Sequence, residues 1–303
     1  MAVSSQTSDI CDRYRLAGRT VLVTGGGRGF GRELALAFVR AGANVAVTAH
    51  RSRDELDATV AMAETLARGR TLGVIADAAS QKDCDALVDT IGTRFGAVDI
   101  LVNNAARGPI DAMPSYDIGK PLPFWSADAQ RYAEVVQTNV VGPFLLARAF
   151  APGMVERGFG RIINISTSRP TMIRRGAGPY GATKAALEAS TRVWADDLDG
   201  TGVTVNALLP GAASDTALIP GGDVGTRAAA DFRPGHGPRG DLGRISGLLP
   251  ADILVPPALW LSSRFSDGFT GRRLIAKDWD PHIDPAKALL AAADEASTMP
   301  NIL

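Results

Sequence analysis

The sequence predicts a single-domain α/β protein built on a doubly wound parallel sheet, and three observations support this fold class. Short apolar runs alternate with longer segments of helical periodicity over most of the chain. This alternation is typical of βαβ units, whose helices cover both faces of a parallel sheet. Right-handed crossovers then wind the sheet in both directions. No linker divides the 303 residues and no internal repeat is visible, so we expect one domain.

The first half of the chain gives three strand–helix pairs after a polar, weakly ordered arm over residues 1–18. Short apolar runs bounded by polar residues or glycines predict strands. They lie at 20–24, 44–48 and 71–76. The segments between them repeat apolar residues on one side of a helix. These segments predict helices over 32–40, 54–68 and 82–95.

The second half continues the alternation but contains two long irregular stretches. Strands are expected at 99–103, 161–166, 203–208 and 273–276, and helices over 126–151 and 179–198. The Rossmann-type α/β domain is therefore expected to span residues 19–280. Residues 106–124 and 212–247 are rich in Pro or Gly, and we interpret 212–247 as a lid segment, because long loops in compact domains are usually functional. Residues 281–303 form a C-terminal extension, helical in pattern at 285–295.

Composition narrows the classes of function. Lys and Arg number 32, as do Asp and Glu, so the basic excess typical of nucleic-acid binders is missing. The apolar run Ile253–Leu261 is too short to span a bilayer. Cys11 and Cys84 lie far apart and the three histidines lack metal-ligand spacing, so we expect neither disulfides nor a metal. The polar N-terminus shows no secretory signal, and we expect a cytoplasmic protein without nucleic-acid or membrane partners.

A glycine-rich turn follows the first predicted strand and opens the first helix. It reads Thr24-Gly-Gly-Gly-Arg-Gly-Phe-Gly31. Glycine allows the sharp turn with positive φ and lets a pyrophosphate approach the free N–H groups of the helix N-terminus. In this strand–turn–helix context the turn predicts dinucleotide binding. The candidate residues are Thr24, Gly25, Gly27, Arg28, Gly29, Phe30 and Gly31.

Five elements together resemble the short-chain dehydrogenase/reductase family. The turn has the spacing TGxxxGxG, and Asn103-Asn-Ala-Ala106 is similar to the family's NNAG element, with Ala in the last place. Asn139 resembles the family's helix asparagine, Tyr180-Gly-Ala-Thr-Lys184 matches YxxxK, and Pro210-Gly211 matches the PG element. They occur in family order over nearly the whole chain. The resemblance implies a Rossmann-like domain that binds a nicotinamide cofactor, with Asn104, Ala105, Lys184, Pro210 and Gly211 beside it.

The end of the second strand predicts which nicotinamide cofactor binds. An acidic residue there would accept the ribose 2′-OH of NAD, but Ala49 occupies the position and His50 and Arg51 follow. A guanidinium can bind a 2′-phosphate with two hydrogen bonds, so Arg51 and Arg28 favour NADP(H). Alternatively, both arginines are solvated surface charges. The resemblance places Asp77 at the adenine ring, whereas its sequence position also suits a turn or helix cap.

Tyr180 and Lys184 share one helix face, since they are four residues apart. An ammonium close to a phenol favours the phenolate, so we expect Lys184 to lower the pKa of Tyr180 and assist acid–base work on a carbonyl or alcohol oxygen. The family's serine position falls on Thr167, whose hydroxyl can polarise the same oxygen. Ser168, and then Ser166, are the alternatives if the register shifts. The resemblance implies that Asn139 bends its helix and holds a water in a proton relay.

These residues predict an NADP(H)-dependent oxidoreductase that interconverts a carbonyl and a secondary alcohol of a small molecule. We also expect a homodimer or homotetramer. A non-catalytic NADP(H)-binding sensor or structural protein is the alternative, because fold does not fix function. A dehydratase or epimerase that uses the same Tyr180–Lys184 pair is a second alternative. The adjacent Arg174 and Arg175 could bind an anion or could be a solvated surface pair. Phe124 and Trp125 could belong to a lid or to the core. The substrate cannot be identified from the sequence.

Overall fold

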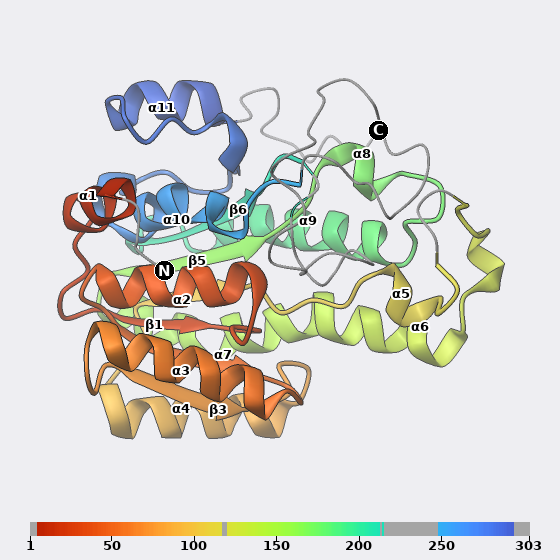
Figure 1. The fold of residues 1–303 in the computed structure, drawn as a ribbon, viewed down its shortest axis with the longest axis horizontal. Helices are drawn as coiled ribbons and strands as arrows, with labels where there is room; N and C mark the ends of the chain where they lie inside the picture. Colours follow the sequence, from red (N-terminus) through yellow and green to blue (C-terminus); the bar gives the residue numbers. More distant parts are fainter. Residues whose placement is uncertain (1–4, 117–119, 213, 215–247, 294–303) are drawn as a thin grey trace.

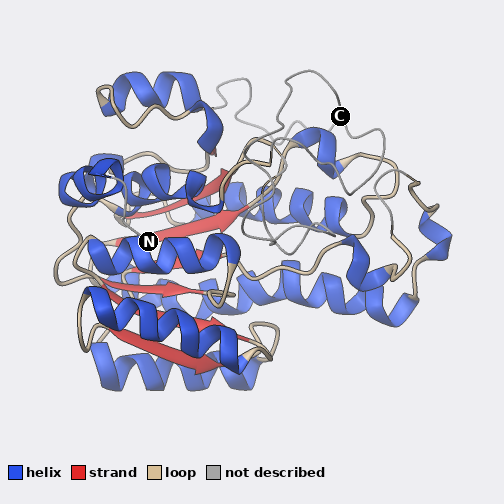
Figure 2. Ribbon diagram, in the orientation of Figure 1, coloured by secondary structure: helices blue, strands red, loops and turns tan. Residues whose placement is uncertain are grey.

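The computed structural model describes residues 5–116, 120–212, 214 and 248–293. In it, seven parallel strands form one sheet in the order β3-β2-β1-β4-β5-β6-β7 (Figures 1 and 2). The strands are β1 (Thr20–Val23), β2 (Asn44–Ala49), β3 (Thr71–Ile75), β4 (Ile100–Asn103), β5 (Gly160–Ile165), β6 (Val203–Leu209) and β7 (Arg273–Ile275). The predicted single-domain, doubly wound parallel sheet is confirmed, and every predicted strand is present.

Helices cover both faces of the sheet, which explains why its strands are apolar throughout. On one face lie α2 (Gly29–Arg40), α3 (Arg53–Leu66) and α10 (Val255–Ser262); on the other lie α4 (Gln81–Phe95), α7 (Gly142–Glu156) and α9 (Tyr180–Asp197). Successive side chains of a strand point to opposite faces. Accordingly, Val21 and Val23 of β1 join the first core and Leu22 joins the second.

The two ends of the described chain pack on the domain. Residues expected to form a weakly ordered arm contain helix α1 (Ser5–Arg13), and Ile10, Cys11 and Tyr14 are buried against the core that includes α2. The prediction was wrong here because Ile10 and Cys11, with Tyr14 just after the helix, suffice to dock a short helix whose other residues are polar. Helix α11 (Pro285–Ala292) buries Ala288 and Ala292 in the same core.

The single long helix expected over 126–151 is divided into several parts. A 3₁₀ turn (Phe124–Ser126) leads to α6 (Ala129–Val136), a π-helical turn (Gln137–Val141) and α7. Helix α6 begins where the Asp128 carboxylate accepts a hydrogen bond from the Arg131 N–H at 2.8 Å. Phe124 and Trp125 are 77% and 74% exposed, which excludes the core alternative for both.

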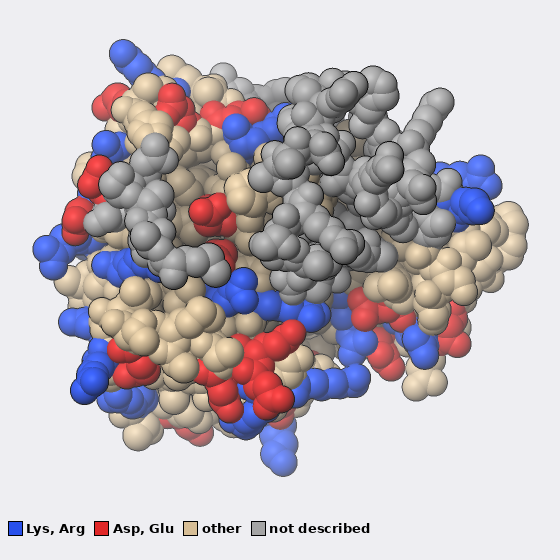
Figure 3. Space-filling model, in the orientation of Figure 1, with Lys and Arg blue, Asp and Glu red and all other residues tan. Residues whose placement is uncertain are grey.

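Short helices and 3₁₀ turns lie in the connections between the longer elements. They are α5 (Pro109–Ala112), α8 (Arg169–Met172) and the 3₁₀ turns Ala251–Leu254, Arg264–Ser266 and Ala276–Asp278. Acidic and basic side chains are interspersed on the face shown in Figure 3. Across the described ranges, no helix combines the length and apolar character needed to cross a membrane. The expected lid over 212–247 lies outside the described residues, apart from 212 and 214.

Two helical glycines differ sharply in the space around them. A Cβ atom on Gly31, in the first turn of α2, would lie 2.2 Å from the Gly25 carbonyl oxygen and 2.6 Å from the Asn104 side-chain nitrogen. Backbone cannot move aside as a flexible side chain can. A Cβ atom on Gly92, in α4, would meet nothing within 4 Å. The glycine at 31 is therefore required by close packing, and the one at 92 is not.

We expect Gly31→Ala to lower the free energy of unfolding by about 1–3 kcal/mol, because it overpacks rigid backbone. The matched variant Gly92→Ala should raise it by about 0.5–1 kcal/mol, because it removes only the entropy cost of a helical glycine. Urea unfolding followed by circular dichroism measures both values. A Gly31→Ala protein as stable as the wild type would show that the turn can move away from the new methyl group.

Candidate active site

The predicted site residues meet at the carboxyl end of the parallel sheet. The glycine turn follows β1, Asn104 follows β4, Thr167 follows β5 and Pro210 follows β6. Strands β1 and β4 are neighbours, although β2 and β3 lie between them in the chain. The chain order reverses at this point, and such switch points are where open α/β sheets bind ligands.

Hydrogen bonds tie the glycine turn to the end of β4. The Thr24 hydroxyl accepts hydrogen bonds from the Asn104 and Ala105 N–H groups, both at 3.0 Å. The side-chain Nδ2 of Asn104 donates to the main-chain carbonyls of Thr24 at 2.8 Å and Gly25 at 3.0 Å. Gly25 and Gly29 have φ of 63° and 52°, which glycine adopts readily. Thr24 and Asn104 therefore shape the turn.

The turn leaves the start of α2 suited to an anion. Arg28 precedes the helix and makes no side-chain cap, so the first N–H groups of α2 lack the usual partner. Thr59 of α3 donates to the Gly27 carbonyl at 3.0 Å and fixes the other side of the turn. Phe30 packs against the core. Uncapped N–H groups at a 12-residue helix, next to a turn fixed from both sides, fit a pyrophosphate.

The residues expected at the 2′-phosphate are close to carboxylates. Ala49 is buried, whereas His50 and Arg51 are exposed. The Arg28 guanidinium has a carboxylate partner, because its Nη1 lies 3.1 Å from Oε1 of Glu55 in the first turn of α3. Glu55 could not be predicted as a partner of Arg28, since its approach depends on how α3 packs beside the turn.

Asp77 lies in a turn, which is one of the settings that its sequence position suited. Its carboxylate accepts a hydrogen bond from the Ala79 N–H at 2.9 Å, as in a turn. It also lies 3.6 Å from Nε2 of His50. The helix cap of α4 is Ser80 instead, which accepts from the Asp83 N–H.

Tyr180 and Lys184 both point into the protein from the first turns of α9. Tyr180 is 8% exposed and Lys184 is 2% exposed. The Lys184 ammonium donates a hydrogen bond to the Ile165 carbonyl at 2.7 Å and lies 5.8 Å from the centre of the Tyr180 ring. The Thr167 side chain is near enough to the Tyr180 phenol to lower its pKa as a hydrogen-bonding neighbour. Two hydroxyls therefore converge beside a buried ammonium.

Burial governs the ionisation of this pair. It raises the pKa of Tyr180 to about 12, although the Thr167 hydrogen bond and the Arg174 charge oppose the rise. The expectation that Lys184 lowers this pKa is wrong, because desolvation dominates and the ammonium is directed at Ile165. Burial lowers the pKa of Lys184 to about 8, although the negative charge of Glu188 opposes this fall.

The two serines considered as alternatives to Thr167 have other partners. Ser166 donates to Oε1 of Glu188 at 2.5 Å, and the Ser168 and Thr171 hydroxyls are 2.9 Å apart. Of the three hydroxyls, that of Thr167 is the one that acts on the pKa of Tyr180.

A buried ion pair that the sequence analysis missed lies behind Thr167. Nε of Arg273 is 2.7 Å from Oε2 of Glu188, and Nη2 of Arg273 donates to the Thr167 carbonyl at 3.3 Å. Glu188 lies four residues after Lys184, so its place on the same helix face could have been read from the sequence. Arg273 joins only because β7 pairs with β6. The pair holds the backbone that carries the Thr167 hydroxyl.

Asn139 lies in the π-helical turn and is fully buried. Its side chain accepts a hydrogen bond from the Arg107 N–H at 2.8 Å and donates to the Arg107 carbonyl at 2.9 Å and the Thr183 hydroxyl at 3.0 Å. The widened turn agrees with the implied local distortion of the helix. The water relay stays a prediction.

The segment after β7 packs against the Pro210–Gly211 element. Gly211 has φ of 94°, and a Cβ atom there would lie 2.5 Å from Cγ of Lys277. The Lys277 N–H donates to the Pro210 carbonyl at 3.1 Å.

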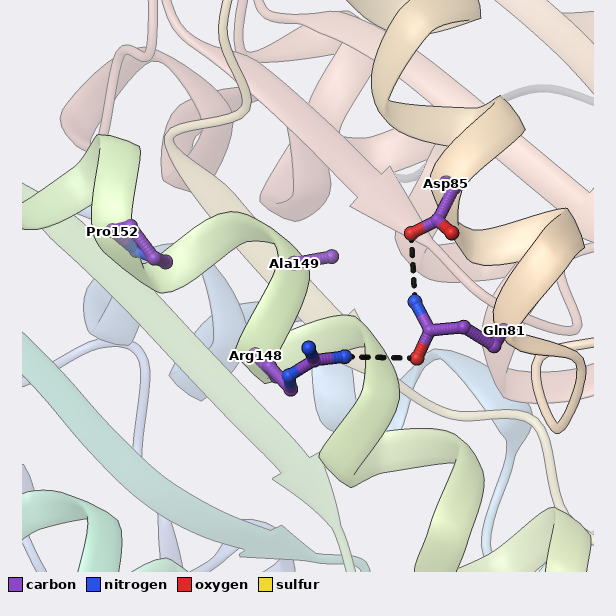
Figure 4. A pocket seen from close by; sticks show the side chains of 5 residues that line it. All are labelled: Gln81, Asp85, Arg148, Ala149 and Pro152. Carbon is purple, nitrogen blue, oxygen red and sulfur yellow. Dashed lines mark hydrogen bonds between the residues drawn. The ribbon is translucent and has the colours of Figure 1, made fainter.

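An open hollow between α4 and α7 contains none of these candidates. It is lined by Gln81, Asp85, Arg148, Ala149 and Pro152 (Figure 4). Gln81 bridges two of them, since it donates to Asp85 at 2.7 Å and accepts from Arg148 at 3.0 Å. Among the residues that the structure describes, no group of three or more His, Cys, Asp or Glu side chains could hold a metal ion.

The chain belongs to the short-chain dehydrogenase family, whose model, described as "short chain dehydrogenase", matches residues 19–220. It is 33% identical over 240 residues to a short-chain type dehydrogenase/reductase of Picea abies, covering 78% of this chain and 84% of that protein. It is 30% identical over 262 residues to 2-dehydro-3-deoxy-D-gluconate 5-dehydrogenase of Formosa agariphila, covering 86% and 91%. The relatives named here are dehydrogenases or reductases.

Two solved structures of similar fold hold different cofactors. The gluconate 5-dehydrogenase of Burkholderia cenocepacia, in complex with NADP and tartrate, has a TM-score of 0.67 and 28% identity, covering 88% of this chain and 96% of that one. The 3-ketoacyl-(acyl-carrier-protein) reductase of Brucella melitensis, complexed with NADH, has a TM-score of 0.68 and 28% identity, covering 86% and 97%.

Replacing Lys184 should change how stability depends on pH. Its pKa falls from 10.5 in the unfolded chain to about 8 in the folded one, so the unfolded state binds more protons between these values and stability rises with pH there. Lys184→Met removes this dependence. From pH 7 to pH 10 the stability of the wild type relative to the variant should rise by about 2–3 kcal/mol.

Urea unfolding at several pH values measures this difference. Lys82→Met, which replaces an exposed lysine of α4, is the control and should show no comparable change. A wild-type advantage that stays constant with pH would mean that Lys184 keeps an ordinary pKa in the folded protein.

Proposed function

We propose that this protein is an NADP(H)-dependent oxidoreductase that interconverts a carbonyl and a secondary alcohol. One observation carries the proposal. The Tyr180 phenol, shielded from water and influenced by the Thr167 hydroxyl, lies with the buried Lys184 ammonium at the carboxyl end of the sheet, where the glycine turn is also found. A protonated donor of this kind is what the reduction of a carbonyl requires.

Each side chain has a distinct task in this proposal. The bound cofactor supplies or accepts the hydride. Tyr180, whose pKa is about 12, is protonated at neutral pH and donates a proton to the carbonyl oxygen during reduction. The Thr167 hydroxyl donates a second hydrogen bond to that oxygen and stabilises its developing negative charge. Lys184 would hold the nicotinamide ribose, and its pKa of about 8 suits proton exchange near neutral pH.

The preference for NADP(H) rests on charge around the end of β2. Ala49 leaves no carboxylate to repel a 2′-phosphate, while Arg51 and His50 are exposed at the same strand end. Glu55 offsets part of the charge of Arg28, but it also holds the guanidinium near the turn. Relatives of this fold have been solved with NADP and with NADH, so the family does not decide the preference.

The proposal leaves the substrate open. The printed names of relatives include a fluoren-9-ol dehydrogenase of Terrabacter and a gluconate 5-dehydrogenase of Gluconobacter oxydans, whose substrates differ widely. The reaction class is what these names share. Assembly as a dimer or tetramer and a cytoplasmic location remain predictions.

Tyr180→Phe should lower the rate of NADPH oxidation with a ketone panel by about 10²–10⁴-fold, because it removes the proton donor. NADPH affinity, measured by fluorescence titration, should change little. The matched control is Tyr14→Phe, which removes the hydroxyl of another buried tyrosine, one that packs with Phe265. NADPH binding without turnover of any carbonyl by the wild type would favour the sensor alternative. A Tyr180→Phe enzyme with wild-type activity would contradict the proposed role.

Arg28→Ala and Arg51→Ala should each weaken NADPH binding about tenfold or more and leave NADH binding nearly unchanged, because each removes a charged hydrogen bond to the 2′-phosphate. Glu55→Gln should strengthen NADPH binding by freeing Arg28. Arg68→Ala, an exposed arginine just before β3, serves as the control. Equal losses for both cofactors would show that the 2′-phosphate is bound elsewhere.

A further inference from the structure

Arg174 lies in the segment that joins α8 to α9, between Thr167 and Tyr180 in the chain. Its Nη2 is 3.3 Å from the phenol oxygen of Tyr116, a neutral partner. Its Nε is buried and has no hydrogen-bond partner within the part of the chain that the structure describes. The positive charge of Arg174 also opposes the rise in the pKa of the Tyr180 phenol.

Three other cations near the site, Arg107, Arg273 and Lys184, have partners of their own. Arg107 lies 3.1 Å from Oε2 of Glu134 and donates to the Thr138 hydroxyl. Arg273 pairs with Glu188 at 2.7 Å, and Lys184 donates to a main-chain carbonyl. Arg174 differs from these two arginines, because no carboxylate pairs with it among the described residues.

The surrounding backbone fixes where Arg174 lies. The Ala177 N–H donates to the Arg174 carbonyl at 3.0 Å, which closes a turn. Gly176 has φ of 78°, and a Cβ atom there would lie 2.6 Å from Cβ of Pro121. Tyr116, on the other side, is buried. The guanidinium is therefore held beside the site, whereas the next residue, Arg175, is exposed.

We propose that Arg174 binds a carboxylate group of the substrate, so that the protein acts on small keto acids and hydroxy acids. Nε and Nη2 form one edge of the guanidinium, and this edge matches the two oxygens of a carboxylate. In the protein alone this edge has only the long contact to Tyr116. A bound carboxylate would supply the missing acceptor and direct its carbonyl toward Tyr180 and Thr167. The inference rests on the oxidoreductase activity proposed above.

Matched substrates test the inference. Levulinate and acetoacetate are compared with their methyl esters as ketone substrates with NADPH. The wild type should favour the acids over the esters by at least tenfold in kcat/KM. Arg174→Gln should reduce this ratio at least tenfold, Arg174→Lys should retain part of it, and Arg175→Gln should keep it. Because the ratio compares two substrates on one protein, any effect of the variant on Tyr180 cancels.

A binding measurement separates failure of this inference from failure of the proposed activity. In saturating NADP⁺, succinate but not succinamide should raise the melting temperature of the wild type, and Arg174→Gln should abolish the rise. If this pattern occurs and no carbonyl is reduced, the carboxylate site stands and the proposed activity fails. If ketones are reduced but the acid-to-ester ratio is equal in the wild type and Arg174→Gln, and succinate has no effect, the inference is overturned while the oxidoreductase proposal stands.

Discussion

The hydrogen bond from the Lys184 ammonium to the Ile165 carbonyl joins α9 to the end of β5, and the arrangement of the site depends on it. Tyr180 lies one turn earlier on α9, and Thr167 lies two residues beyond Ile165, so this contact also sets where their hydroxyls meet. Shielding from water strengthens the hydrogen bond but disfavours the charge, which is why the pKa of Lys184 falls to about 8. The site therefore combines firm positioning with an ammonium that can exchange a proton.

Close backbone contacts supply the remaining precision. At Gly181, one residue into α9, a Cβ atom would lie 2.1 Å from the Met172 carbonyl oxygen. Only glycine lets the α8 segment, which leads into Arg174, approach the start of α9 so closely. Gly31 plays the same part for the cofactor turn, since it lets α2 begin directly against Gly25. Small residues thus determine which larger side chains can reach the carboxyl end of the sheet.

Charge at the site is arranged by pairing carboxylates with arginines. Glu55 faces Arg28 at the turn, and Glu188 faces Arg273 behind Thr167. The two pairs differ in their surroundings, because the first is largely exposed and the second is almost fully buried. The buried pair fixes structure, since separating it would leave an uncompensated charge away from water. The exposed pair remains open to competition from an anionic ligand.

The sequence by itself determined the strands, the glycine turn, the Tyr180–Lys184 pair and the family, because these follow from local periodicity and from spacing within single elements. Only the tertiary structure decided how charges and hydroxyls are paired. Glu55 reaches Arg28, Arg273 reaches Glu188, and Tyr180 is buried deeply enough for desolvation to outweigh any nearby charge. Such pairings join residues far apart in the chain, and desolvation depends on every element packed around a side chain, so neither can be derived from sequence spacing.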